Sequence, residues 1–220
     1  MSKANLCRFD LHIHTTRYSP DSEINPFQLM RRAKALGLTG IVITEHDHVW
    51  PEKELAELRA ATPEVQVYSG VEVSAEEGHF LVYGIPNMQS LFRGIALEEL
   101  CKTVHQAGGV VIAAHPYRWG QDFDAILQAA PALDGVEVMS KNIDQASETK
   151  ITSLWQGRRW AGLGNSDAHA IDQLGCCYTE FNTNIQSLRD LVQAMKKGMA
   201  QPVHRVKTSD AAIDADETLA

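Results

Sequence analysis

The chain has 220 residues and a formal net charge of −8, with 44% hydrophobic and 22% charged residues. This composition is that of an ordinary globular protein, and the length suits one domain with a substantial core rather than two. The acidic balance argues against a broad grip on duplex nucleic acid, and no apolar run approaches the roughly 18 residues of a membrane span.

The N-terminal residues contain no apolar segment typical of a secretory signal, so we expect a cytoplasmic protein. The cysteines Cys7, Cys101, Cys176 and Cys177 show no CxxC pair and no framework spacing. That pattern predicts reduced thiols rather than disulfides or metal ligands. A single domain is expected over residues 1–207. Residues 208–220 are acidic and lack aromatic side chains, which is typical of a disordered tail.

Strand-like runs alternate with helix-like runs along the chain. We expect strands at 6–12, 40–44, 65–73, 80–83, 110–114, 135–138, 162–164 and 176–181. We expect helices at 26–36, 52–61, 97–106, 123–129, 145–158 and 185–197. The alternation predicts an α/β fold with a parallel sheet, and several strand runs are apolar throughout, as in strands buried on both faces.

Local signals support several of the helix boundaries. Asn25 is a good cap for the first helix, and Pro26 suits its first turn. Left-handed caps are expected just after three helices, at Gly37, Gly108 and Gly198. These residues predict where the chain leaves one element and turns toward the next.

Histidines and carboxylates gather at the ends of the strand runs. His12 and His14 are two residues apart in a strand, so both side chains point to one side and can bind one metal ion. Taken alone, the pair is explained equally well as a polar strand face. Three further groups lie at 44–48, at 78–79 with 114–116, and at 165–169. Because sites in parallel α/β folds lie at the C-terminal strand ends, this placement favours a barrel-like α/β enzyme.

These motifs resemble those of the PHP (polymerase and histidinol phosphatase) family of metal-dependent phosphoesterases. The similar stretches are Asp10-Leu11-His12-Ile13-His14-Thr15, Thr44-Glu45-His46-Asp47, Gly70-Val71-Glu72 with Gly78-His79, Ala114-His115-Pro116, and Gly164-Asn165-Ser166-Asp167-Ala168-His169. The resemblance implies an α/β fold of one domain, a distorted (β/α)7 TIM-like barrel. The chain departs from the family pattern at Glu45, where Asp is commoner, and in the loop 16–21, which has no His.

The resemblance also implies a centre of two or three divalent ions. The first ion would be held by His12, His14, Glu72 and Asp167, with Glu72 bridging to a second ion at His79 and His115. The third would be held by His46 and His169, with Asp21 as the favoured loop ligand and Ser19 as a poorer one. Glu72, Asp167 and His169 are the implied catalytic residues. Imidazole and carboxylate ligands without thiolate suit Zn²⁺, Mn²⁺ or Fe.

Three cations follow strand runs on the face expected to hold the metal ions: Arg17, Arg118 and Lys141. Each can bind a substrate phosphate, and an ordinary solvated or ion-paired side chain is the alternative. Arg118 is the first choice, and Trp119 beside it suits either stacking on a ring or packing at the rim. Asp10 is expected to orient a metal-ligating His.

The predicted function is metal-dependent hydrolysis of a phosphate ester by a metal-activated bridging hydroxide. The expected partner is a small phosphorylated substrate, either a phosphomonoester or a short nucleotide, with no membrane and no extended nucleic-acid surface. A 3′–5′ exonuclease and a non-catalytic accessory PHP module are the alternatives. Complete ligand positions favour catalysis, and the acidic composition disfavours binding of long strands.

Overall fold

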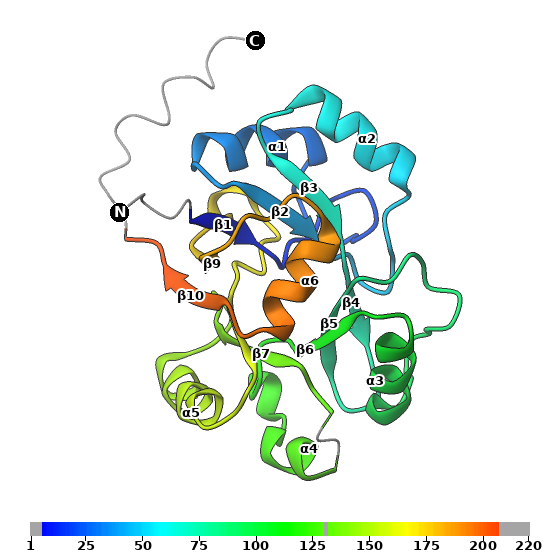
Figure 1. The fold of residues 1–220 in the computed structure, drawn as a ribbon, viewed down its shortest axis with the longest axis vertical. Helices are drawn as coiled ribbons and strands as arrows, with labels where there is room; N and C mark the ends of the chain where they lie inside the picture. Colours follow the sequence, from blue (N-terminus) through cyan, green and yellow to red (C-terminus); the bar gives the residue numbers. More distant parts are fainter. Residues whose placement is uncertain (1–5, 130–131, 207–220) are drawn as a thin grey trace.

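The computed structural model describes residues 6–129 and 132–206, and the predicted tail at 208–220 lies outside them. Within the described residues, helices pack around two five-stranded sheets (Figure 1). The strands are β1 (Cys7–Asp10), β2 (Gly40–Ile43), β3 (Gln66–Ser69), β4 (Val71–Ser74), β5 (His79–Tyr83), β6 (Val110–Ala113), β7 (Gly135–Met139), β8 (Ala161–Gly164), β9 (Cys177–Phe181) and β10 (Ala200–His204). The helices are α1 (Pro26–Ala35), α2 (Glu52–Ala61), α3 (Leu97–Gln106), α4 (Phe123–Ala129), α5 (Gln145–Gln156) and α6 (Leu188–Lys196), with 3₁₀ segments η1 (Arg118–Gly120) and η2 (Ile171–Gln173).

The two sheets mix parallel and antiparallel pairs. The first has the order β10-β9-β1-β2-β3. Strands β1, β2 and β3 run parallel to one another, and β9 runs antiparallel to both of its neighbours, β1 and β10. The second has the order β4-β5-β6-β7-β8, antiparallel from β4 to β6 and parallel from β6 to β8. The α/β class is therefore confirmed, but a purely parallel sheet is wrong, because β4 and β5 form a hairpin that needs no crossover helix.

A closed (β/α)7 barrel is not confirmed. In the described part of the chain, the sheets meet through isolated bridges, from Ile13 to Ala168 and from His46 to Glu72. The Tyr83 hydroxyl adds a buried cross-link by donating to the Leu11 carbonyl at 2.9 Å. These links bring the two sheet ends together at the residues singled out in the sequence.

The strand expected at 65–73 is two strands in two different sheets. Gly70 separates β3 from β4, and a Cβ at this position would lie 2.8 Å from Tyr83 and 2.9 Å from the Val82 carbonyl. Only glycine allows this close approach where the chain passes between sheets. The sequence also gave no signal for β10, whose five residues include Pro202 and pair with the full length of β9.

Most helix signals are confirmed. The Asn25 side chain accepts hydrogen bonds from the backbone of Phe27 and Gln28, with Pro26 in the first turn of α1. The glycines that follow α1, α3 and α6 have φ of 67°, 85° and 65°, as left-handed caps require. Helix α6 begins at Leu188 rather than 185, because the Ser187 side chain caps it by accepting from the Asp190 backbone. Helix α5 ends two residues earlier than expected, at Gln156.

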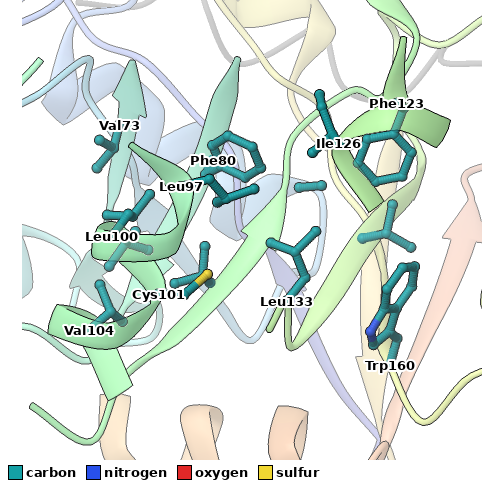
Figure 2. Packing of buried hydrophobic residues seen from close by; sticks show 14 of the residues in the cluster. Val73, Phe80, Leu97, Leu100, Cys101, Val104, Phe123, Ile126, Leu133 and Trp160 are labelled. Atoms are coloured by element: carbon teal, nitrogen blue, oxygen red, sulfur yellow. The ribbon is translucent and has the colours of Figure 1, made fainter. Parts of the chain in front are cut away.

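The apolar face of α3 shows why these helices stay on the sheets. Figure 2 shows Leu97 beside Phe80 and Leu100 near Val73 of the second sheet, with Val104 further along the helix, and all of these side chains are at most 1% exposed. Burying each large aliphatic or aromatic side chain contributes about 1.5–3 kcal/mol. In the described residues, no helix is both long and apolar enough to cross a membrane.

Candidate metal centre

The structure brings together all of the ligands that the resemblance implied. His12 and His14 follow β1, His46 follows β2, and Asp167 and His169 follow β8. Glu72 lies in β4, and His115 follows β6. Glu72 and His79 are the exceptions to the expected strand-end placement, because Glu72 is the second residue of β4 and His79 begins β5. Since β5 runs antiparallel to β6, its first residue lies at the same edge as the end of β6.

Four ligand atoms define an inner set at the centre of the cluster. His12 Nε2 lies 3.4 Å from Glu72 Oε2 and 3.3 Å from Asp167 Oδ1. His14 Nε2 lies 3.2 Å and 3.4 Å from the same two oxygens. All four side chains are at most 1% exposed. The inner set is thus a buried ring of two nitrogens and two oxygens.

This geometry fits a metal ion. Zinc binds nitrogen and oxygen ligands at about 2.0–2.2 Å in a tetrahedron, whose edges are then about 3.3–3.6 Å. Among the described residues, His12 Nε2 and His14 Nε2 are buried atoms without a hydrogen-bond partner. Glu72 Oε2 faces both of them and also lies 2.9 Å from His46 Nδ1. Because unpaired buried polar atoms are costly, two ring nitrogens converging on the same carboxylate oxygens indicate a cation between them.

The carboxylate of Glu72 joins the inner set to a second group of ligands. Its other oxygen, Oε1, lies 2.9 Å from His79 Nδ1 and 2.9 Å from His115 Nε2. His12, Glu72 and His115 also offer ligand atoms within 4.8 Å of one another. Glu72 therefore has the geometry of a carboxylate shared by two cations.

An outer set of three residues, Asp21, His46 and His169, lies closer to solvent. Asp21 Oδ2 lies 3.1 Å from His46 Nε2 and 3.4 Å from His169 Nε2. The side chains are 54%, 27% and 26% exposed, respectively. His14 also offers a ligand atom within 4.8 Å of those of His46 and His169, so the inner and outer sets are contiguous.

The carboxylate that orients a metal-ligating histidine is Glu137, which the sequence reading missed. His12 Nδ1 lies 3.0 Å from Glu137 Oε1, and the His115 backbone N–H donates to Glu137 Oε2 at 2.7 Å. The expected partner, Asp10, instead accepts from the backbone of Ser166 at 3.0 Å and of Gly175 at 2.9 Å. Asp10 therefore positions the segment that carries Asp167 rather than a ring. Glu137 lies in mid-strand in β7, so no strand-end signal marked it.

Strained backbone accompanies the cluster. Non-glycine residues with positive φ in the described chain include His115 at 28°, Asp167 at 51° and Asp47 at 49°. Tyr117 and Trp119, in the loop after His115, have φ of 67° and 55°. Such conformations cost about 1–3 kcal/mol each and tend to collect at functional sites.

The buried histidines and carboxylates of the cluster shift one another's pKa values. Burial tends to raise the pKa of Glu72, but the rings of His12, His115 and His14 outweigh burial and hold that pKa well below its ordinary value. Burial tends to lower the pKa of His14, but the carboxylates of Asp167 and Glu72 beside its ring raise it to about 9. Protons on the imidazoles thus balance the buried carboxylates, and metal ions can replace those protons.

The predicted phosphate-binding cations lie in different settings. Arg118 Nη1 contacts Asp167 Oδ2 at 3.2 Å, and its guanidinium lies 4.1 Å from the Trp119 ring centroid. Arg17 lies outside the cluster, in an ion pair with Glu54 at 2.8 Å. Lys141 is exposed and has no hydrogen bond or ion pair within the described residues.

The structure also adds Asn142 to the site. Its side-chain amide donates to Asp167 Oδ2 at 2.6 Å, so Asn142 and Arg118 both contact the oxygen of Asp167 that lies outside the inner set. A short polar residue next to Lys141 gave no signal in the sequence, because only the fold brings β7 beside the segment after β8.

A pocket opens beside the second group of ligands, with a volume of about 440 Å³. His79, His115, Arg93, Arg118 and Trp119 are among the residues that line it. Trp119 is 73% exposed, and its ring centroid lies 5.6 Å from each of the two histidine rings. An exposed indole in a strained backbone therefore stands at the mouth of the site.

A buried cluster of imidazoles and carboxylates at one edge of an α/β fold defines a metal-binding protein. The chain belongs to the PHP domain family, whose model matches residues 10–144. A second model, described as PHP-associated, matches residues 150–199. The family resemblance drawn from the sequence motifs is thereby confirmed.

The chain is also similar to a protein of known sequence and to several solved structures. The uncharacterized protein MJ1587 of Methanocaldococcus jannaschii is 31% identical over 118 residues, covering 49% of this chain and 67% of that protein. A two-domain protein of Bacteroides vulgatus containing a predicted PHP-like metal-dependent phosphoesterase has a TM-score of 0.71 at 18% identity. The match covers 91% of this chain and only 65% of that one, so this chain spans less than two thirds of the Bacteroides protein.

Two further solved structures share the fold. PsfC of Pseudomonas syringae has a TM-score of 0.69 at 18% identity, with 91% of this chain and 92% of that chain covered. An amidohydrolase of Chromobacterium violaceum, solved with bound sulfate and no metal, has a TM-score of 0.62 at 17% identity. That match covers 89% of this chain and 97% of the other.

Proposed function

We propose that this protein hydrolyses phosphate esters of small molecules, either phosphomonoesters or short nucleotides, with two or three divalent ions. The observation that carries the proposal is the convergence of unpaired buried ligand atoms on one point beside Glu72. Zn²⁺, Mn²⁺ and Fe all suit this mixture of imidazole and carboxylate. When bound, such ions lower the pKa of a water molecule and neutralise the charge of a phosphate group.

The residues of the cluster would have different roles in binding the ions and in catalysis. The inner set and the pair His79 and His115 would hold two ions across Glu72, and the outer set would hold a third. Glu72, Asp167 and His169 are the proposed catalytic residues, because their side chains would touch the ions at which the reaction occurs. The burial of the inner set, at most 1% exposed, would exclude bulk water and strengthen its electrostatic interactions.

The pocket beside His79 and His115 is the proposed place for the substrate's leaving group. Arg118 would bind the phosphate, since its guanidinium already contacts an anion, Asp167, at 3.2 Å and has further donors to offer. Trp119 would stack on a planar leaving group. Arg17 and Lys141 remain weaker candidates for the phosphate, because Arg17 is paired with Glu54.

Two alternatives make different demands on the chain. An exonuclease needs cations along a strand-binding groove, and the net charge of −8 does not favour one. An accessory module tolerates decay of the ligands, but every implied ligand side chain is present near the cluster. Both considerations support a small phosphorylated substrate as the partner.

The test is metal analysis of the purified protein, followed by assays on a panel of phosphomonoesters, nucleotides and oligonucleotides. We expect at least two equivalents of metal and turnover of a small ester that is abolished in His12→Ala. His105→Ala is the matched control, because His105 lies on α3 and pairs with Asp134, away from the cluster. Less than one equivalent of metal after reconstitution, or preferred cleavage of long oligonucleotides, would contradict the proposal.

A further inference from the structure

Glu45, the residue at which the chain departs from the family pattern, has a fully saturated buried carboxylate. It is 0% exposed. Oε1 accepts from Thr15 Oγ1 at 2.5 Å and from Trp50 Nε1 at 2.9 Å. Oε2 accepts from the Thr15 backbone at 3.0 Å and from Ser19 Oγ at 2.5 Å. An ionised carboxylate has about four acceptor positions, and all are filled here.

The hydroxyl of Ser19 is saturated in the same way. A serine hydroxyl has one proton to donate and two lone pairs to accept. The proton goes to Glu45 at 2.5 Å. The lone pairs face the His46 backbone N–H at 3.3 Å and His14 Nδ1 at 3.3 Å. Since Ser19 has no second proton, the hydrogen in the contact with His14 must be on Nδ1.

The hydrogen bonds of Ser19 therefore determine which nitrogen of the His14 ring carries a proton. With this proton on Nδ1, a metal ion that replaces the proton on Nε2 meets the lone pair of a neutral ring there. His14 Nε2 is the atom that faces Glu72 and Asp167 and has no hydrogen-bond partner in the described structure. A partner at the far nitrogen that fixes the tautomer and the ring orientation is what a metal-ligating histidine requires.

We infer that Ser19 and Glu45 are positioning residues for His14, and that Ser19 relays the Glu45 carboxylate to the ring rather than binding metal itself. The inference rests on the proposed metal centre and deepens it. His12 receives the same support directly, from Glu137 at 3.0 Å. His14 is two residues further along the chain and receives it through a hydroxyl, because Glu45 reaches Ser19 and not the ring.

Position in the chain strengthens the assignment. Glu45 directly precedes His46, and Thr15 directly follows His14. The two bonds from Thr15 therefore tie the segment of one ligand to the segment of the other. Glutamate has a longer side chain than aspartate, and the carboxylate of Glu45 reaches both Trp50 and Ser19. The departure from Asp at this position therefore has a structural reason, because Ser19 lies in the loop 16–21, which contains no His.

The experiment measures zinc affinity and ring protonation in the full chain. Chelator competition gives the affinity for each ion, and ¹⁵N NMR of the zinc-loaded protein reports exchange of the His14 Nδ1 proton. In Ser19→Ala and Glu45→Gln we expect the ion of the inner set to bind about 10–100-fold more weakly. The His14 Nδ1 proton should lose its protection from exchange. Glu45→Asp, which keeps the charge, should recover part of the affinity.

Glu54→Gln is the matched control. Glu54 pairs with Arg17 and Tyr18 of the same loop but from its outer side, so zinc affinity should stay at the wild-type value. Equal weakening in Glu54→Gln would indicate general loosening of the loop and overturn the inference. So would loss of only the outer ion in Ser19→Ala, which would make Ser19 a metal ligand.

The failure of this inference can be told apart from failure of the proposed function. If the wild-type protein binds none of Zn²⁺, Mn²⁺ and Fe, the proposed function fails, and the inference fails with it. If the wild-type protein binds zinc and Ser19→Ala binds it equally tightly with a protected His14 proton, only the positioning role is overturned. Glu45→Gln preserves side-chain volume and supplies the same readouts if Ser19→Ala does not fold.

Discussion

The inner and outer ligand sets differ in burial and in support. The inner side chains are at most 1% exposed, and each far atom has a partner: Glu137 for His12, Ser19 for His14, and Asn142 for Asp167. In the outer set, Asp21 is 54% exposed, and His169 Nδ1 lies 3.1 Å from the backbone carbonyl of Asp167 and 3.7 Å from its Oδ1. The ligands of the inner set are therefore held in place more firmly than those of the outer set. We expect the outer ion to bind more weakly and to exchange faster.

Glu72→Gln should have the largest effect, because it removes a charge shared between cations while keeping the side-chain volume. Metal content should fall below one equivalent. The loss in rate should approach that of His12→Ala, and the two losses should not add, since the residues act as a unit. Metal analysis and kcat measurements on the two single variants and the double variant test this. Near-normal turnover in Glu72→Gln would mean that the bridging carboxylate is misassigned.

Asp21→Ala separates the two sets. The outer ion should lose a charge-assisted ligand and bind about 100-fold more weakly, at the upper end of the effect of one such contact. The inner ion should keep its affinity, because none of the inner atoms contacts Asp21. Titration of the metal-free protein with metal ions, with binding followed separately for each equivalent added, measures the affinities of the inner and the outer ion. Equal loss from both sets would contradict the division into inner and outer ligands.

Arg118→Ala tests whether the cation beside the inner set serves the substrate or the metal. We expect a loss of about 1.5–3 kcal/mol in transition-state stabilisation, or about 10–100-fold in kcat/KM, with unchanged metal content. Lysine should restore only part of the activity, because a point charge lacks the two-pronged geometry. Arg8→Ala is the control, since Arg8 pairs with Glu180 on the first sheet. Loss of metal would instead make Arg118 a support for Asp167.

Trp119→Leu should have the smallest effect and should depend on the substrate. Stacking between aromatic rings contributes about 0.5–1.5 kcal/mol beyond area burial. The KM for an aryl or nucleoside phosphate should therefore rise about 2–10-fold, while that for a small alkyl phosphate should stay the same. Steady-state kinetics on one ester of each kind give the comparison. An equal rise for both would show that the indole shapes the loop and not the leaving-group pocket.

Much of the fold could be predicted because its signals are local. Helices α1 and α3 follow from the Asn25 cap, the Gly37 and Gly108 turns and the apolar spacing, which act within a few residues. Which strands pair with one another, and whether they run parallel or antiparallel, could not be predicted from local signals. The run at 65–73 has alternating valines on both sides of Gly70, and the close approach of Gly70 to Tyr83, where the chain changes sheets, is visible only in the tertiary structure.

The metal ligands could be predicted because each lies in a motif beside a strand end, where residue type alone limits the chemistry. The orienting residues were missed or misassigned. Glu137 lies in mid-strand, Asn142 follows β7 as an ordinary polar residue, and Asp10 proved to hold backbone rather than a ring. Their roles depend on contacts across 25 to 165 positions of sequence, which no local pattern encodes.

By itself, the sequence determined the helices, most strands, the family and the ligand chemistry of this protein. Those properties follow from short-range propensity and from side-chain chemistry, which do not depend on distant residues. Only the tertiary structure decided that the strands form two sheets, that Glu72 faces two groups of ligands, and which residues hold each histidine ring. A hydrogen bond requires atoms to meet within about 3 Å, and that condition is met only after segments distant in the chain have packed together.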